Sequence, residues 1–348
     1  MKEAAVSNAE LSVLGFRMRA ATEAAARAAY DWIGRGDKVE GDRAAMAAMR
    51  AELAGLPVRG TIVVGESGSG GLGDDGTALL AGDVIGGRGA GGPGAGSAPF
   101  DPGAGSAPFD IAVDPVEGTS YLARGMTNAL AVLAMAPQGS LFRPGPCFYM
   151  EKFVGPPVVR GKIDPGMSVA DKLAVVARET GKPLTDLTVF VLEKPRHRDL
   201  IQDIYAAGAR VALYPAGDIA GALMAAIPDS GIDCLMGTGG TPEGIITACA
   251  IRSLGGVFYG RMNPQLNGER LAVRDAGIDT NRWYAAEDLA RSDQVVFCAT
   301  GITTGLLLQG VERQGRSVRT ETLLLCGEGQ GRQVISNWQP VAAGAARP

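Results

Sequence analysis

The sequence is organised around one segment, which reads Phe109-Asp110-Ile111-Ala112-Val113-Asp114-Pro115-Val116-Glu117-Gly118-Thr119-Ser120. The apolar residues 111–113 predict a short buried strand. We expect Pro115 to end this strand, because proline cannot donate to a strand ladder, and Gly118 to permit a tight bend. The resulting turn would hold the carboxylates of Asp114 and Glu117 close to the hydroxyl of Thr119.

These groups suit two kinds of ligand. Carboxylate oxygens are preferred by Mg²⁺ and Mn²⁺, whereas backbone N–H groups and a hydroxyl suit a phosphate. An Asp-Pro-x-Glu turn by itself is more often a plain polar turn after a buried strand. The turn alone therefore indicates a metal or phosphate site without deciding for one.

Composition restricts the classes of protein to which the chain can belong. Its 348 residues, 46% of them hydrophobic, allow one large domain or two of ordinary size with a full core. A formal net charge of −4 argues against nucleic acid as the main partner. The five cysteines have no CxxC spacing, so we expect reduced, buried thiols. No apolar signal segment or membrane-length run is evident, and we expect a cytoplasmic protein without membrane contact.

The single histidine, His197, limits the possible chemistry further. A zinc site with several histidine ligands cannot be built, and a Ser-His-Asp or Cys-His hydrolase would depend on this one side chain. If the protein is a hydrolase, carboxylates and metal ions are the economical route.

The pattern of expected elements changes near residue 168. Before it we expect a long helix over 9–34, a second helix over 43–53 with Asp42 as its N-cap, and strands over 61–64 and 129–135. After it, helices and strands alternate, which is typical of a layered α/β domain. We therefore predict an α/β protein with an N-terminal α+β domain, 1–167, and a C-terminal α/β domain, 168–348.

Residues 86–109 form a Gly/Pro-rich insertion in the first of these domains. Gly94-Ala95-Gly96-Ser97-Ala98-Pro99-Phe100 is repeated at 103–109. Such residues bury little surface, so we expect a surface loop without a catalytic role.

The turn at 114–119 resembles the metal-binding motif of the lithium-sensitive phosphatase superfamily. The longer run, which continues through residues 128–134, resembles the class II (GlpX-type) fructose-1,6-bisphosphatases, including bacterial forms that also accept sedoheptulose 1,7-bisphosphate. The resemblance covers residues 8–338 except 67–108. It implies the layered αβαβα sugar-phosphatase fold, with the last strands returning to the first domain.

The resemblance also implies a site for Mn²⁺ or Mg²⁺. Its metal ligands would be Asp42, Glu66, Asp114, Glu117 and Glu243. The family's acidic turn, Gly-Glu-Gly-Glu-x-Asp-Glu-Ala-Pro, is altered here to residues 65–75. Glu66 keeps the first glutamate, the second is missing, and Asp74 is the best counterpart of the following aspartate, four residues late. Glu66, Asp74 and Thr119 are the catalytic residues implied.

The sugar and its phosphates would be bound by residues from several loops. The resemblance implies Glu117, Gly118, Thr119, Tyr149, Lys194, Pro195, Arg196, Ala216, Gly217, Asp218 and Gly240. Arginine suits bidentate phosphate contact. Ala216 stands where the family has an aspartate, so one polar contact is expected to be lost.

The function implied is metal-dependent hydrolysis of the C1 phosphate of fructose 1,6-bisphosphate in carbohydrate metabolism (gluconeogenesis or the Calvin cycle), by a homo-oligomer. Two alternatives remain open. One is an inositol-monophosphatase-like enzyme of the same superfamily with another substrate, such as inositol monophosphate or a nucleotide bisphosphate. The other is a sugar-phosphate-binding protein with weak catalysis, which the altered acidic turn and Ala216 would favour.

Overall fold

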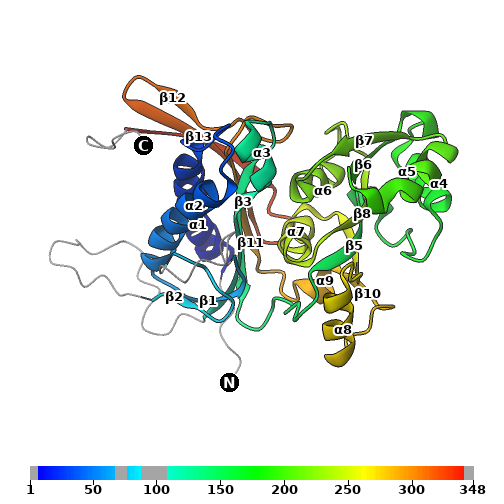
Figure 1. Ribbon diagram of the computed structural model, residues 1–348, viewed down its shortest axis with the longest axis horizontal. Helices are drawn as coiled ribbons and strands as arrows, with labels where there is room; N and C mark the ends of the chain where they lie inside the picture. The colour runs from blue at the N-terminus through cyan, green and yellow to red at the C-terminus, as the bar shows by residue number, and fades with distance from the viewer. Residues whose placement is uncertain (1–6, 67–76, 88–107, 341–348) are drawn as a thin grey trace. The chain divides into compact units, whose positions relative to one another are not determined.

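The computed structural model describes residues 7–66, 77–87 and 108–340 (Figure 1). The chain divides into two compact units. The first unit consists of residues 1–141 and 294–348, and the second consists of residues 142–293. The sequence predicted a boundary at 167/168, where helix–strand alternation begins. The difference arises because the strand at 149–155 pairs with two later strands of the second unit. That residues 1–167 and 168–348 are two separate domains stays a prediction.

The first unit is built on a mixed sheet. Its order is β12-β13-β11-β4-β3-β1-β2, with β14 also paired to β13. β1 and β3 are parallel, and the other described pairs are antiparallel. The strands are β1 Arg59–Val64, β2 Val84–Gly86, β3 Phe109–Glu117, β4 Leu130–Pro137, β11 Val296–Gly301, β12 Glu312–Gln314, β13 Ser317–Cys326 and β14 Arg332–Pro340.

Two helices, α1 (Asn8–Tyr30) and α2 (Lys38–Ala54), pack on this sheet. The N-cap of α2 is Asp37, whose carboxylate accepts hydrogen bonds from the N–H groups of Val39 and Glu40, both at 3.0 Å. The prediction that Asp42 is the cap was therefore wrong: Asp42 lies in the second turn and is buried. Asp37 follows Gly36, whose φ is positive, and its carboxylate caps the helix at this point. The helix therefore begins at Lys38 and not at Arg43.

Strand β3 does not end at Pro115, as the sequence suggested, but continues to Glu117. Asp114 is paired with Val132 and Glu117 with Leu130, so three steps on β3 match two on β4. This extra residue is a β-bulge, in which a proline without an N–H is tolerated. The N–H of Val116 donates instead to the Asp114 side chain at 3.1 Å.

The second unit has a six-stranded sheet of order β10-β9-β5-β8-β6-β7, in which β6 is parallel to β7 and β8. Its strands are β5 Tyr149–Gly155, β6 Thr188–Leu192, β7 Arg210–Tyr214, β8 Cys234–Gly240, β9 Val257–Met262 and β10 Trp283–Ala285. Its α-helices are α4 Val169–Thr180, α5 Arg198–Ala206, α6 Asp218–Ala226, α7 Thr241–Leu254, α8 Asn267–Asp275 and α9 Ala286–Leu289.

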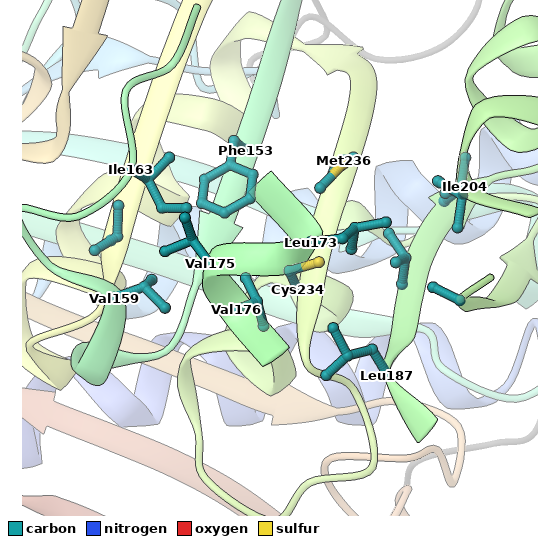
Figure 2. Packing of buried hydrophobic residues seen from close by; sticks show 14 residues of the cluster. Phe153, Val159, Ile163, Leu173, Val175, Val176, Leu187, Ile204, Cys234 and Met236 are labelled. Carbon is teal, nitrogen blue, oxygen red and sulfur yellow. The ribbon is translucent and has the colours of Figure 1, made fainter. Parts of the chain in front are cut away.

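Helices cover both faces of this second sheet. Leu173 of α4 and Ile204 of α5 belong to one apolar cluster (Figure 2). Val189 and Val191 of β6 belong to the same cluster. Phe190, which points to the opposite face, lies against Gly221 of α6. Successive side chains of β6 thus pack against helices on the two opposite faces of the sheet. Together with the helix-on-sheet packing of the first unit, this confirms the mixed α/β class.

The start of α4 was read correctly from the sequence. The Ser168 side chain caps the helix by accepting a hydrogen bond from the N–H of Asp171 at 3.1 Å. All five cysteines are free and buried, as expected. Among the described helices, none combines the length and apolarity that a membrane span requires.

Close packing of α1 on the sheet gives a stability prediction. A Cβ added at Gly15 would lie 2.5 Å from Cys326 Sγ, 3.1 Å from Leu324 and 3.2 Å from Val296. Overpacking of this kind costs about 1–3 kcal/mol, more than the ~0.5–1 kcal/mol gained from helix propensity. We expect Gly15→Ala to lower the thermal unfolding midpoint.

Gly268→Ala is the control, because a Cβ at this helical position meets no described atom within 4 Å. It should leave the midpoint unchanged or raise it slightly. Equal effects of the two substitutions would show that α1 does not pack on the sheet as described.

Candidate active site

Two carboxylates meet at the bulge of β3. An oxygen of Asp114 lies within 4.8 Å of an oxygen of Glu117, with Glu117 buried and Asp114 half-buried. The extra residue in the bulge is what allows both side chains to project near one another, since residues three apart in a regular strand point to opposite faces. Like charges at this spacing favour a shared cation.

Gly118 turns the chain directly from this bulge into a helix. Its φ is 85°, in the left-handed region, and a Cβ here would lie 2.6 Å from the Tyr121 ring. It is the N-cap of the short helix α3, Thr119–Arg124. The N–H of Tyr121 donates to the Gly118 carbonyl at 2.8 Å, so it is the N–H groups of Thr119 and Ser120 that have no acceptor within the helix. The predicted phosphate-binding residues Gly118 and Thr119 therefore lie directly beside the paired carboxylates.

Glu66 and Asp42 belong to the same unit as these two carboxylates. Glu66 follows β1, and its backbone is paired with Leu79. Because β1 is parallel to β3, with Val64 opposite Ala112, the Glu66 backbone lies at the same edge of the sheet as Asp114. The 4.8 Å grouping of Asp114 and Glu117 does not include Asp42 or Glu66 within the described chain. Asp74 lies outside the described residues.

In the second unit, His197 fixes the loop that carries Lys194, Pro195 and Arg196. The N–H of Thr238 donates to Nε2 at 2.7 Å, so Nδ1 carries the proton and donates to the carbonyl of Leu192 at 2.6 Å. Burial lowers the pKa of His197, which keeps the ring neutral. The side chain of the single histidine thus links the end of β6 to β8 through two hydrogen bonds.

Arg196 is held by the same residue that His197 contacts. Its Nε and Nη2 donate to the carbonyl of Thr238 at 3.0 and 2.7 Å, and its guanidinium lies 5.2 Å from the Tyr149 ring centre. Tyr149 begins β5, whereas Lys194 immediately precedes a 3₁₀ turn over Pro195–His197. Strand ends from three parts of the second unit therefore bring Tyr149 and Arg196 together.

The second unit also contains a buried ion pair, which was not predicted from the sequence. Lys152 Nζ lies 2.5 Å from Asp218 Oδ2, with side-chain exposures of 2% and 9%. Asp218 starts α6 after Gly217, whose φ of 84° makes the turn, and Ala216 precedes it. Lys152 is 66 residues away along the chain, in the middle of β5. The packing of α6 against β5 brings the two side chains together.

Glu243, in the first turn of α7, lies near this pair. Its Oε2 is buried and has no hydrogen-bond partner within the described residues. Burial raises the pKa of Glu243, and Asp218 raises it further, whereas Lys152 opposes the change. A Cβ at Gly240 would lie 1.7 Å from Glu243 Oε2, so the glycine leaves room for this carboxylate. A buried, unpaired carboxylate oxygen is the kind of group that a cation would satisfy.

The ion pair can be tested by a double-mutant cycle. Lys152→Met leaves the buried Asp218 carboxylate without its cation, which should reduce the free energy of unfolding by about 3–5 kcal/mol. Adding Asp218→Asn removes the unpaired charge, so the double variant should be more stable than Lys152→Met alone. Chemical denaturation of the four proteins measures the coupling. Additive losses would contradict a direct buried pair.

Comparison with known proteins agrees with this chemistry. A family model described as bacterial fructose-1,6-bisphosphatase, glpX-encoded, matches residues 12–338. The fructose-1,6-bisphosphatase 1 class 2 of Escherichia coli K12 is 42% identical over 320 residues, which are 88% of this chain and 89% of that protein. Class 2 fructose-1,6-bisphosphatases of Escherichia coli O6:H1 and Shigella flexneri match to the same extent. The resemblance inferred from the 114–119 turn is confirmed: this chain belongs to the family of bacterial, glpX-encoded fructose-1,6-bisphosphatases.

Proposed function

We propose that this protein hydrolyses the C1 phosphate of fructose 1,6-bisphosphate to give fructose 6-phosphate and inorganic phosphate. The observation that carries this conclusion is the pair of carboxylates, Asp114 and Glu117, beside the first turn of α3. Relatives 42% identical over most of their length are named for this activity. Phosphoryl transfer requires carboxylates that hold a cation and, next to them, N–H groups that bind a phosphate.

The residues present fit a divalent cation. Asp114 and Glu117 offer closely spaced hard oxygen ligands, and Glu243 has a buried oxygen without a described partner. We propose Asp42, Glu66 and Glu243 as the further ligands, with Mg²⁺ or Mn²⁺ as the ion. When bound, such an ion neutralises phosphate charge and makes a water more acidic. Tetrahedral zinc chemistry is a poorer fit, because the set contains only carboxylates.

The remaining roles belong to the protein's own groups. We propose that the N–H groups of Gly118 and Thr119, with the Thr119 hydroxyl, orient the phosphate that is transferred. Glu66 and Thr119 would align the attacking water, with Asp74 assisting. Glu117 would contribute to binding this phosphate as well as to holding the metal ion. The in-line geometry of the reaction then depends on the rigid bulge of β3.

The rest of the substrate would be bound by the second unit. Lys194 and Arg196 suit the distal phosphate, and the contact of Arg196 with Tyr149 and Thr238 supports a preorganised guanidinium. Tyr149 and Asp218 would contact the sugar. Pro195, Ala216, Gly217 and Gly240 shape the loops around it. Because Asp218 is paired with Lys152, its carboxylate has a fixed orientation.

Three further points are proposals as well. Sedoheptulose 1,7-bisphosphate would be a second substrate. The enzyme would act in carbohydrate metabolism, in gluconeogenesis or the Calvin cycle. Five buried, free thiols support a reducing compartment, for which we propose the cytoplasm. We propose a homo-oligomer, as the family resemblance implied.

Phosphate release from fructose 1,6-bisphosphate tests the proposal, with Mn²⁺, Mg²⁺ or EDTA, and with inositol 1-phosphate as the competing substrate. We expect release from the bisphosphate only, and only with metal. Release from inositol 1-phosphate alone would contradict the assignment. Binding of the bisphosphate without turnover would show a sugar-phosphate-binding protein instead.

Glu243→Gln tests the metal set within the same assay. Losing outer ligand partners costs about 10–100-fold, so loss of a direct ligand should reduce kcat by roughly 100-fold or more. Glu287→Gln, an exposed glutamate of the same unit, is the matched control and should leave kcat unchanged. Near wild-type turnover by Glu243→Gln would remove Glu243 from the proposed ligands.

A further inference from the structure

A second site is indicated by a pocket that none of the proposed active-site residues lines. It has a volume of about 520 Å³ and lies within the second unit, between β9, α8 and the segment that follows α8. Its polar wall consists of Arg261, Asn263, Arg270, Arg274 and Thr280. Small-molecule sites usually have ~300–1,000 Å³, so the pocket is of a size to hold a metabolite.

Arg261 forms a fixed part of this wall. Its Nη2 lies 2.5 Å from a carboxylate oxygen of Glu151, and its guanidinium carbon lies 4.8 Å from the Trp283 ring centre. Its charge is therefore largely balanced by Glu151. The free positive charge of the pocket has to come from the other two arginines.

Arg270 and Arg274 stand four residues apart on α8, so they are neighbours on one helix face. Arg270 Nε donates to the carbonyl of Pro264 at 3.1 Å, and the described chain supplies no carboxylate for its guanidinium. Among the described residues, Arg274 forms an ion pair only with the adjacent Asp275, and the two side chains are 72% and 69% exposed. Exposed pairs of this kind contribute little and are readily exchanged for another anion.

No aspartate or glutamate is among the residues that line the described pocket. Two guanidinium groups with available N–H donors, and the hydroxyl of Thr280 nearby, match the acceptor oxygens of phosphate groups. Uncharged ligands would leave the arginine donors unused. The chemistry therefore selects an anion with more than one charged oxygen group.

We propose that this pocket binds a phosphorylated small molecule through Arg270 and Arg274, separately from the proposed sugar-bisphosphate site. The proposal concerns binding alone and does not depend on phosphatase activity. One wall residue does connect the two regions, because Asn263 Nδ2 donates to Thr238 Oγ1 at 2.9 Å, and Thr238 holds Arg196. The pocket is thus one side chain away from the loop proposed for the distal phosphate.

Calorimetric titration with pyrophosphate tests the proposal. The 348-residue chain is stripped of metal with EDTA and measured at about 0.15 M salt, where surface charge is screened as in cells. Pyrophosphate offers one phosphate group to each arginine. We expect saturable binding by the wild type and, in Arg270→Gln/Arg274→Gln, an affinity at least about tenfold lower, because charged hydrogen bonds are lost.

Arg178→Gln/Arg210→Gln is the matched control. It removes the same charge from the same unit at side chains that are 64% and 62% exposed and do not line the pocket. Its affinity should stay within about twofold of the wild type. Arg270→Lys, which keeps the charge, should retain part of the binding.

Three outcomes would overturn the proposal. The first is absence of binding to the wild type, and the second is wild-type affinity in the Arg270/Arg274 variant. The third is an equal loss in both double variants, which would mean that pyrophosphate responds only to net charge. Failure of the phosphatase assay would leave this result unaffected, because the titration measures no turnover.

Discussion

The bulge in β3 between Asp114 and Glu117 is the constraint on which the candidate site depends. β3 is buried between β1 and β4, so its backbone has little freedom to adjust. In a regular strand these two carboxylates would point to opposite faces, and the extra residue removes that conflict. Proline inside the bulge and glycine directly after it make the geometry reproducible. Two carboxylates and a helix N-terminus then follow from one short segment.

The second unit depends in a similar way on one residue of β8. Thr238 donates its N–H to His197 and accepts two hydrogen bonds from Arg196 through its carbonyl. A neutral histidine is required, because Nε2 must accept. The basic loop is therefore rigid, although its charged ends remain available for a ligand. A preorganised loop loses less entropy when a phosphate binds.

Much of this could be predicted from local sequence. Asp114, Glu117, Gly118 and Thr119 lie within six consecutive residues, so their proximity required no knowledge of the fold. Ser168 as a helix cap was equally local. Two local predictions failed: Asp37, not Asp42, caps α2, and Pro115 does not end β3. Both aspartates stand where a helix could begin, so local sequence does not decide between them. Propensity rules also cannot recognise a proline that a β-bulge accommodates.

The features that the sequence could not supply are non-local. Lys152 and Asp218 form a buried pair because β5 and the start of α6 meet, and nothing in either segment indicates the other. The division at 141/142 and 293/294 depends on the pairing of β5 with β8 and β9. The arginine pocket likewise combines β9, α8 and the following segment. Such contacts follow from strand order, which periodicity does not determine.

We propose that the β3 bulge holds a divalent cation. Electron paramagnetic resonance of Mn²⁺ measures this directly, by titrating the ion into the wild type and Asp114→Asn and observing the free-ion signal. Asp199→Asn, at an exposed position, is the control. We predict that Asp114→Asn binds fewer Mn²⁺ ions, or binds them more weakly, with an unchanged thermal midpoint. Wild-type affinity and stoichiometry in Asp114→Asn would show that Asp114 holds no cation.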